Sequence, residues 1–95
     1  MENAEEIHKV MDTALAAIEE IYKNQAISDV EVEEIEQEPA TLERERGDWL
    51  ITVGFNIDKP RSVLGNLVMS PRTLKVIRVD PSGKFRSMKN REPVT

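Results

Sequence analysis

The chain has 95 residues, a formal net charge of -5 and no cysteine, with 39% hydrophobic and 33% charged residues. This length fits a single domain, residues 1–95, with a modest core, and the absence of cysteine excludes disulfides and cysteine metal ligands. No segment is long and apolar enough to span a bilayer, and the acidic N-terminal residues do not form a secretory signal. We therefore expect a soluble, cytoplasmic protein without a membrane partner.

The first segment is predicted to be an amphipathic helix at about 4–23. Apolar residues recur there at spacings of three and four, which is the stripe of a helix with one buried face. Asn3, followed three residues later by Glu6, resembles an N-cap with its capping-box acid. The stripe consists of Ile7, Val10, Met11, Ala14, Leu15, Ile18, Ile21 and Tyr22.

Residues 28–37 are predicted to form a half-buried strand with an acidic outer face. Val30 and Val32 alternate there with glutamates, as side chains on opposite faces of a strand do. Ile35 breaks this alternation, which indicates a bulge or the end of the strand before Pro39.

Residues 48–57 give a clearer strand pattern. Trp49, Ile51, Val53, Phe55 and Ile57 alternate with smaller or polar residues, so one face of this strand is continuously apolar. A helix and a strand that are each apolar on one face can bury those two faces against each other.

The last third of the chain predicts a β-hairpin, with strands at 73–79 and 84–90. The sequence Asp-Pro-Ser-Gly at 80–83 has the residue preferences of a type I turn. Six basic residues and one acidic residue fall between Thr73 and Arg91. The basic residues are Lys75, Arg78, Lys84, Arg86, Lys89 and Arg91.

These elements together predict an α+β fold, in which one N-terminal amphipathic helix packs on a three- to four-stranded antiparallel meander sheet. The apolar face of the 48–57 strand should contact the helical stripe, in particular Ile7, Val10, Met11, Leu15 and Ile18. Phe85 is expected to contribute to the same core.

The segment 58–72 is unusually apolar for a loop. Two interpretations stay open: the segment folds onto the end of the sheet, or it exposes an apolar patch for a protein contact or a homodimer seam. Its candidate contact residues are Val63, Leu64, Leu67, Val68 and Met69.

Two sequence motifs carry a resemblance to known proteins. The strand DWLITVGF and the later LKVIRVDPSGKFRSMKNR resemble a pattern in small, largely uncharacterised bacterial proteins. The order of one helix followed by an antiparallel sheet is also similar to PepSY-like domains and, more loosely, to gas vesicle protein O, an accessory protein of gas vesicle formation. The motif similarity covers roughly the C-terminal half of the chain and implies no catalytic residue.

The sequence offers little for catalysis. His8 is the only histidine and shares a predicted helix side with Glu5 and Asp12, but without a second histidine or any cysteine this set is a poor metal site. No serine lies in a nucleophile elbow, and the glycines do not form a phosphate loop. We expect no enzyme activity, no metal and no cofactor, although a small-molecule pocket between helix and sheet remains an alternative.

Charge is distributed unevenly along the chain. Residues 1–48 contain 15 acidic and 4 basic residues, whereas residues 49–95 contain 3 acidic and 9 basic residues. One interpretation is that the hairpin binds the phosphates of a nucleic acid. The other is that the hairpin pairs within the domain with the glutamates of the first strand, Glu31, Glu33, Glu34 and Glu36.

Our preferred hypothesis from the sequence is a non-catalytic protein-interaction or assembly accessory module, whose partner is a protein or a second copy of the chain. Its contacts would come from the 63–69 apolar residues and from hairpin charges left unpaired, namely Lys84, Arg86, Lys89 and Arg91. Nucleic-acid binding by the same hairpin is the alternative.

Overall fold

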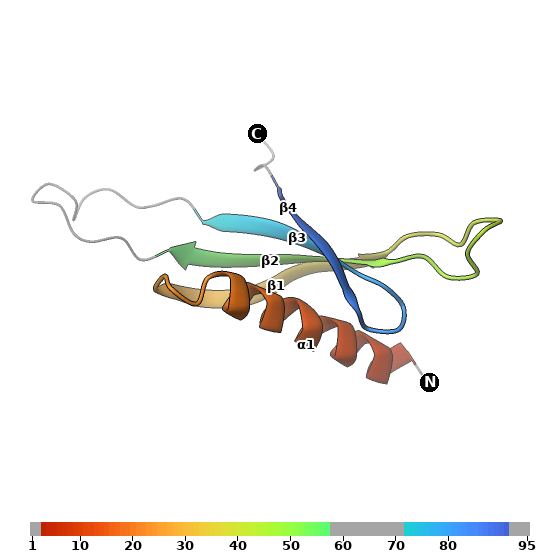
Figure 1. Cartoon of the computed structure of the whole chain (residues 1–95), viewed down its shortest axis with the longest axis horizontal. Helices are drawn as coiled ribbons and strands as arrows, with labels where there is room; N and C mark the ends of the chain where they lie inside the picture. The colour runs from red at the N-terminus through yellow and green to blue at the C-terminus, as the bar shows by residue number, and fades with distance from the viewer. Residues whose placement is uncertain (1–2, 58–71, 92–95) are drawn as a thin grey trace, which may run out of the picture.

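The computed structural model describes residues 3–57 and 72–91, with the side chain of Asn3 excepted. It contains α1 (Asn3–Ile21), β1 (Ile27–Gln37), β2 (Trp49–Ile57), β3 (Thr73–Val79) and β4 (Phe85–Asn90). The strands form one antiparallel sheet in the order β1-β2-β3-β4, and α1 lies along one face of it (Figure 1). The predicted α+β fold is confirmed. We call the opposite face of the sheet, which α1 does not cover, the open face.

Helix α1 ends at Ile21, two residues before the predicted end. The chain turns there because the Gln25 amide donates a hydrogen bond to the Tyr22 carbonyl at 2.9 Å, three residues back rather than four. Glu5 and Glu6 lie in the first turn, where negative charge is favoured by the helix dipole. Within the described residues, no helix is long and apolar enough to cross a membrane.

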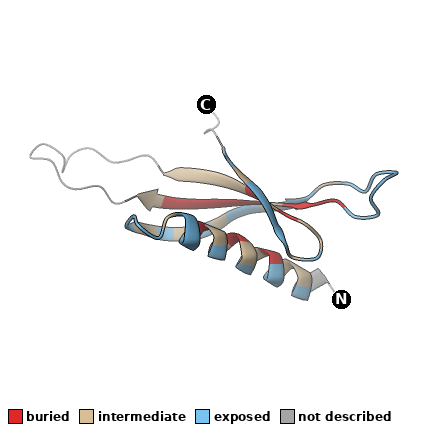
Figure 2. Cartoon of the chain, viewed as in Figure 1, coloured by how far each residue is buried: buried red, intermediate tan, exposed pale blue. Residues whose placement is uncertain are grey.

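The core lies between α1 and the middle of the sheet (Figure 2). Tyr22 meets Phe55 edge-on, with ring centroids 4.8 Å apart. Burying one large apolar side chain contributes roughly 1.5–3 kcal/mol, so this layer supplies most of the favourable free energy of folding. Met11 was expected to contact β2, but it is only partly buried and is not part of the core cluster, whereas Ala14 is fully buried. The buried apolar residues are Val10, Ala14, Ile18, Trp49, Ile51, Val53, Phe55, Ile77 and Val79.

Strand β1 contains two irregularities in its pairing with β2. The register shifts between Ser28 and Glu31 and again between Val32 and Glu34, and Asp29 adopts a positive φ of 53°. The second shift restores Ile35 to the helix-covered face, where it pairs with Ile51 and packs against the core. The break in alternation therefore comes before Ile35, and the strand continues to Gln37.

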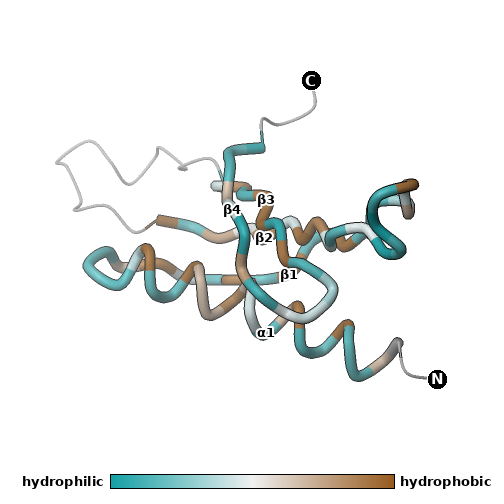
Figure 3. The backbone as a smooth tube through the Cα atoms, turned by 45° about the vertical axis from the view of Figure 1, so that its right-hand side comes forward, coloured by the Kyte–Doolittle hydropathy of each residue, from teal (hydrophilic) through white to brown (hydrophobic). Residues whose placement is uncertain are grey.

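The β3–β4 connection is a tight turn over α1 (Figure 3). The Gly83 amide donates to the Asp80 carbonyl at 2.9 Å, and Gly83 has a φ of +95°, which glycine adopts at low cost. One Asp80 carboxylate oxygen accepts hydrogen bonds from the amides of Ser82 and Lys84. Thr13 of α1 donates to the Gly83 carbonyl at 2.9 Å, so the turn is attached to the helix.

Candidate functional site

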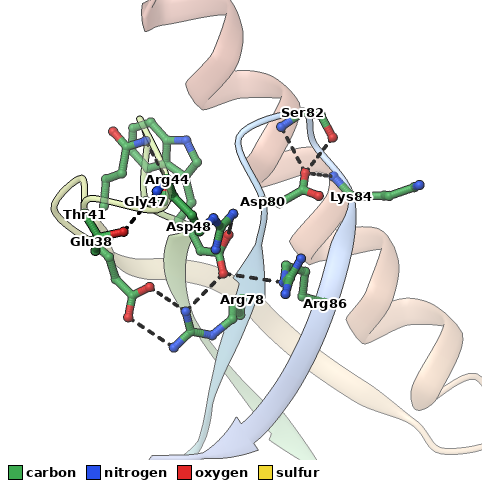
Figure 4. Close-up of polar contacts among 12 residues, drawn as sticks. Glu38, Thr41, Arg44, Gly47, Asp48, Arg78, Asp80, Ser82, Lys84 and Arg86 are labelled. Carbon is green, nitrogen blue, oxygen red and sulfur yellow. Dashed lines mark hydrogen bonds and ion pairs between the residues drawn. The ribbon is translucent and has the colours of Figure 1, made fainter.

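Asp48, directly before β2, is a buried carboxylate surrounded by three arginines (Figure 4). Arg44 donates to it at 2.8 Å and Arg78 at 3.1 Å, and the Nε of Arg86 lies 3.5 Å away. The hydrogen bond from Arg44 is the largest cause that holds the pKa of Asp48 below its ordinary value. Because its oxygens face guanidinium groups and it stays ionised at neutral pH, Asp48 acts as the centre of an ion-pair cluster.

The same cluster joins segments that are distant in the sequence. Arg78 donates two hydrogen bonds to the carboxylate of Glu38, at 2.5 Å and 3.2 Å, and one to Asp48. Glu38 and Asp48 are themselves linked through the Glu38 amide and the Asp48 carbonyl. The arrangement fixes the base of the β1–β2 loop against β3, which is a structural role.

A further arginine crosses the open face above β2. The Nε of Arg72 donates to Glu33 at 2.8 Å, and its Nη2 donates to the carbonyls of Asp29 and Gly54. A Cβ atom at Gly54 would lie 2.4 Å from the Glu33 carboxylate and 2.8 Å from Arg72 Nε. Glycine at this position therefore leaves room for the ion pair to pass over the strand.

The side chain of Arg91, the residue directly after β4, also extends across the open face. It pairs with Glu34 of β1 and donates to the Thr52 hydroxyl of β2 at 3.0 Å. The sequence predicted such pairs between adjacent strands, whereas Arg72 and Arg91 reach β1 from the far side of β2. Glu36 makes no ion pair with any residue in 3–57 or 72–91.

The four basic residues predicted to bind a partner divide into two pairs. Arg86 contacts Asp48 and Arg91 contacts Glu34, so both are already engaged within the domain. Lys84 and Lys89 are exposed and make no ion pair with another described residue. Within residues 3–57 and 72–91, the hairpin is therefore paired through its arginines, whereas Lys84 and Lys89 have no carboxylate partner.

Val63, Leu64, Leu67, Val68 and Met69 lie outside the described residues. Their predicted role in protein contact stays a prediction.

An apolar groove between α1 and β4 is the feature that the sequence did not reveal. It is an open depression of about 400 Å³ with mainly apolar walls, and we call it the α1–β4 groove. Ile21 is 47% exposed and Phe85 44% exposed, and both lie on its walls. The complete lining is Thr13, Ala16, Ala17, Glu20, Ile21 and Phe85.

One sequence prediction is wrong at this groove. Phe85 was expected in the core, yet it exposes nearly half of its surface, as does Ile21 at the end of the apolar stripe of the helix. Phe85 does lie on the helix-covered face, because it pairs with the buried Val79, but β4 is the last strand in the described sheet. Ala16 and Ala17, just outside the stripe, are the sequence signal that the apolar surface of α1 extends beyond the core.

The only histidine, His8, is exposed on α1. Among the residues that the structure describes, no group of three or more His, Cys, Asp or Glu side chains is placed to hold a metal ion. The helix and sheet also pack directly on each other through fully buried side chains, of which Val10, Ile18 and Phe55 are examples. Core side chains therefore occupy the space between helix and sheet at these positions, and small-molecule binding stays a prediction.

Comparison of the chain with known protein families, with curated proteins and with solved structures finds no match. The function is therefore inferred from the site itself.

Proposed function

We propose that this protein is a non-catalytic interaction or assembly accessory module, and that it binds a partner protein through the α1–β4 groove. The observation that carries the proposal is that Ile21 and Phe85, two large apolar side chains, are exposed together on one groove. Clustered exposed apolar side chains in a soluble domain are typical of protein contacts. A cytoplasmic location is part of the proposal.

The surroundings of the groove support a protein partner. Aromatic and aliphatic anchors at the centre of an interface contribute most of the binding free energy, while charges at the rim set orientation and association rate. Phe85 and Ile21 can serve as anchors. Lys84, directly before Phe85 in the sequence, is exposed and has no ion-pair partner among the described residues. The small side chains of Ala16 and Ala17 leave room for a partner side chain.

Single-stranded nucleic acid is the second candidate, because the exposure of Phe85 between Lys84 and Arg86 is favourable for base stacking. Three features favour a protein instead. Arg78, Arg86 and Arg91 are neutralised by carboxylates, so less charge is left for phosphates. Phe85 also faces a helix wall that carries Glu20, and the whole chain is acidic.

The test is affinity co-purification of the tagged protein from its native host, with and without nuclease. Phe85→Ser removes one groove anchor, and Leu42→Ser is the matched control because Leu42 is fully exposed on the β1–β2 loop, outside the groove. We expect a stoichiometric protein that survives nuclease, is lost with Phe85→Ser and is retained with Leu42→Ser. Equal capture by both variants would contradict the proposal, and loss of the captured proteins on nuclease treatment would favour nucleic acid.

A further inference from the structure

Among the described residues, no strand pairs with the outer edge of β4. In the described sheet β4 pairs only with β3. The Arg91 amide donates to the Leu74 carbonyl, and the register then pairs Lys89 with Val76. Because hydrogen-bonded and non-hydrogen-bonded pairs alternate in an antiparallel ladder, Met88 and Asn90 direct their backbone N–H and C=O groups away from β3. These groups can pair with a further strand.

The two faces of β4 differ in chemistry. Phe85 and Met88 lie on the helix-covered face, since they pair with the buried Val79 and Ile77. Lys89 lies on the open face, one position further along the strand from Met88. A strand added at this edge would therefore meet apolar side chains on one face and positive charge on the other.

Charge decides which strand fits. The segment 84–91 contains four basic residues and no acidic residue, and Lys84 and Lys89 have no ion-pair partner among the described residues. A second copy that paired its own β4 antiparallel to this one would bring like charges together, which is destabilising. An acidic strand would instead gain favourable contacts with the same lysines.

We propose that β4 accepts an extended, acidic segment of a partner protein as a fifth strand, in which apolar and acidic residues alternate. The apolar side chains of the segment face the α1–β4 groove, and its carboxylates face Lys89 and the open face. This inference rests on the proposed function of the groove and adds the chemistry and conformation of its occupant. The lysines both discourage self-association of the edge and select an acidic partner.

Binding can be tested on the full chain with three short, capped peptides, measured by fluorescence anisotropy. The first alternates valine and glutamate, the second has lysine in place of glutamate, and the third is the glutamate peptide N-methylated at alternate residues, which removes the amide donors of one edge. We expect the glutamate peptide to bind at least about tenfold more tightly than either of the others. The double variant Lys84→Glu, Lys89→Glu should reverse the preference between glutamate and lysine peptides.

Amide hydrogen exchange, followed by NMR, reports the geometry of the bound peptide. The amides of Met88 and Asn90 should become protected when the glutamate peptide binds, whereas the amide of Lys89, which already faces β3, should change little. Circular dichroism of the lysine variants confirms that they retain the fold.

The possible outcomes separate this inference from the proposed function. Equal binding of glutamate and lysine peptides would overturn the acidic selectivity. Full binding of the N-methylated peptide, with Met88 and Asn90 unprotected, would overturn strand addition while the groove proposal stands. Failure of all peptides, or their displacement by a single-stranded oligonucleotide that protects the same amides, would also overturn the inference. The groove proposal fails separately if Phe85→Ser captures the native partner as well as the wild type does.

Discussion

The carboxylate of Glu6 joins α1 to the start of β2. The indole N–H of Trp49 donates to it at 2.6 Å, and Arg46 pairs with it. The sequence assigned Glu6 to a capping box with Asn3, but the structure directs this carboxylate to Trp49 and Arg46. Its pKa lies below the ordinary value of 4.5, with the hydrogen bond from Arg46 as the largest cause.

Replacing this carboxylate gives a prediction with a defined pH dependence. Glu6→Gln should lower the free energy of unfolding by about 1–2 kcal/mol at neutral pH, because hydrogen bonds to a charged acceptor are lost. Since the folded pKa is lowered, the stabilisation is present above the unfolded pKa and disappears as the pH falls through the folded value. Denaturation followed by Trp49 fluorescence should show the difference shrinking as the pH falls below the unfolded pKa and through the lowered folded pKa.

The control for this prediction is Glu5→Gln, which changes an exposed carboxylate on the same helical turn. A cost of Glu6→Gln that is as large at the acidic end as at neutral pH would contradict the assignment of the effect to the ionised carboxylate.

Gly54 gives a second prediction for a single residue. Gly54→Ala should destabilise the wild type by about 1 kcal/mol, because the new Cβ would displace Arg72 and Glu33 from their contact. In the Arg72→Ala background the same substitution should be neutral or stabilising, since glycine within a strand is entropically unfavourable. Urea denaturation of the four proteins measures this coupling. An equal cost in both backgrounds would show that Arg72 does not set the need for glycine.

Among the structural elements, the β3–β4 turn depends on the backbone of Gly83. Gly83→Ala should reduce the free energy of unfolding by about 1–2 kcal/mol, because its φ of +95° strains any residue with a Cβ atom. Gly83→Asn is the matched comparison and should cost less, since asparagine tolerates left-handed backbone better than alanine. Thermal denaturation checks the order, and a variant with alanine as stable as the wild type would exclude this account of the turn.

The regular elements could be predicted because their patterns are local. The apolar stripe of α1 and the period-two alternation of β2 each follow from residues close in sequence. Contacts across the open face could not be predicted in the same way. The ion pair between Arg72 and Glu33 depends on the strand order and on two register shifts in β1. Neither the strand order nor the shifts can be predicted from residues that are close in sequence.

The candidate site was only partly predictable for a related reason. The basic character of β4 is visible in the sequence, but which residues stay unpaired depends on the distant acids Asp48 and Glu34. The groove was missed because an apolar residue such as Phe85 was taken to be buried. Its exposure follows from the position of β4 at the end of the described sheet, where no further strand covers it.

At the scale of the whole molecule, acidic residues from the first half of the chain form ion pairs with basic residues from the second half. Two of these ion pairs, Arg72–Glu33 and Arg91–Glu34, lie across the open face. The double variant Glu33→Gln, Glu34→Gln removes the carboxylate closest to Arg72, at 2.8 Å, and the carboxylate that pairs with Arg91, while Glu31 stays 3.7 Å from Arg72. We expect a lower unfolding midpoint than wild type at low salt and a smaller difference at about 1 M salt, because salt screens exposed charges. Calorimetry at several salt concentrations measures the trend.

Glu36→Gln is the control for this prediction, since Glu36 is an exposed acid of the same strand without an ion pair among the described residues. If the double variant and the control had the same stability at every salt concentration, the crossing ion pairs would not contribute to holding the two charged halves together.

We propose that the α1–β4 groove and the adjacent edge of β4 together form the partner-binding surface. The most direct measurement is hydrogen exchange of this protein alone and in complex with the partner that it captures from its host. We expect new protection in residues 13–21 of α1 and 85–90 of β4, with the β1–β2 loop at 38–47 unchanged. Protection that appears on that loop or on β1, with α1 and β4 unaffected, would contradict the proposal.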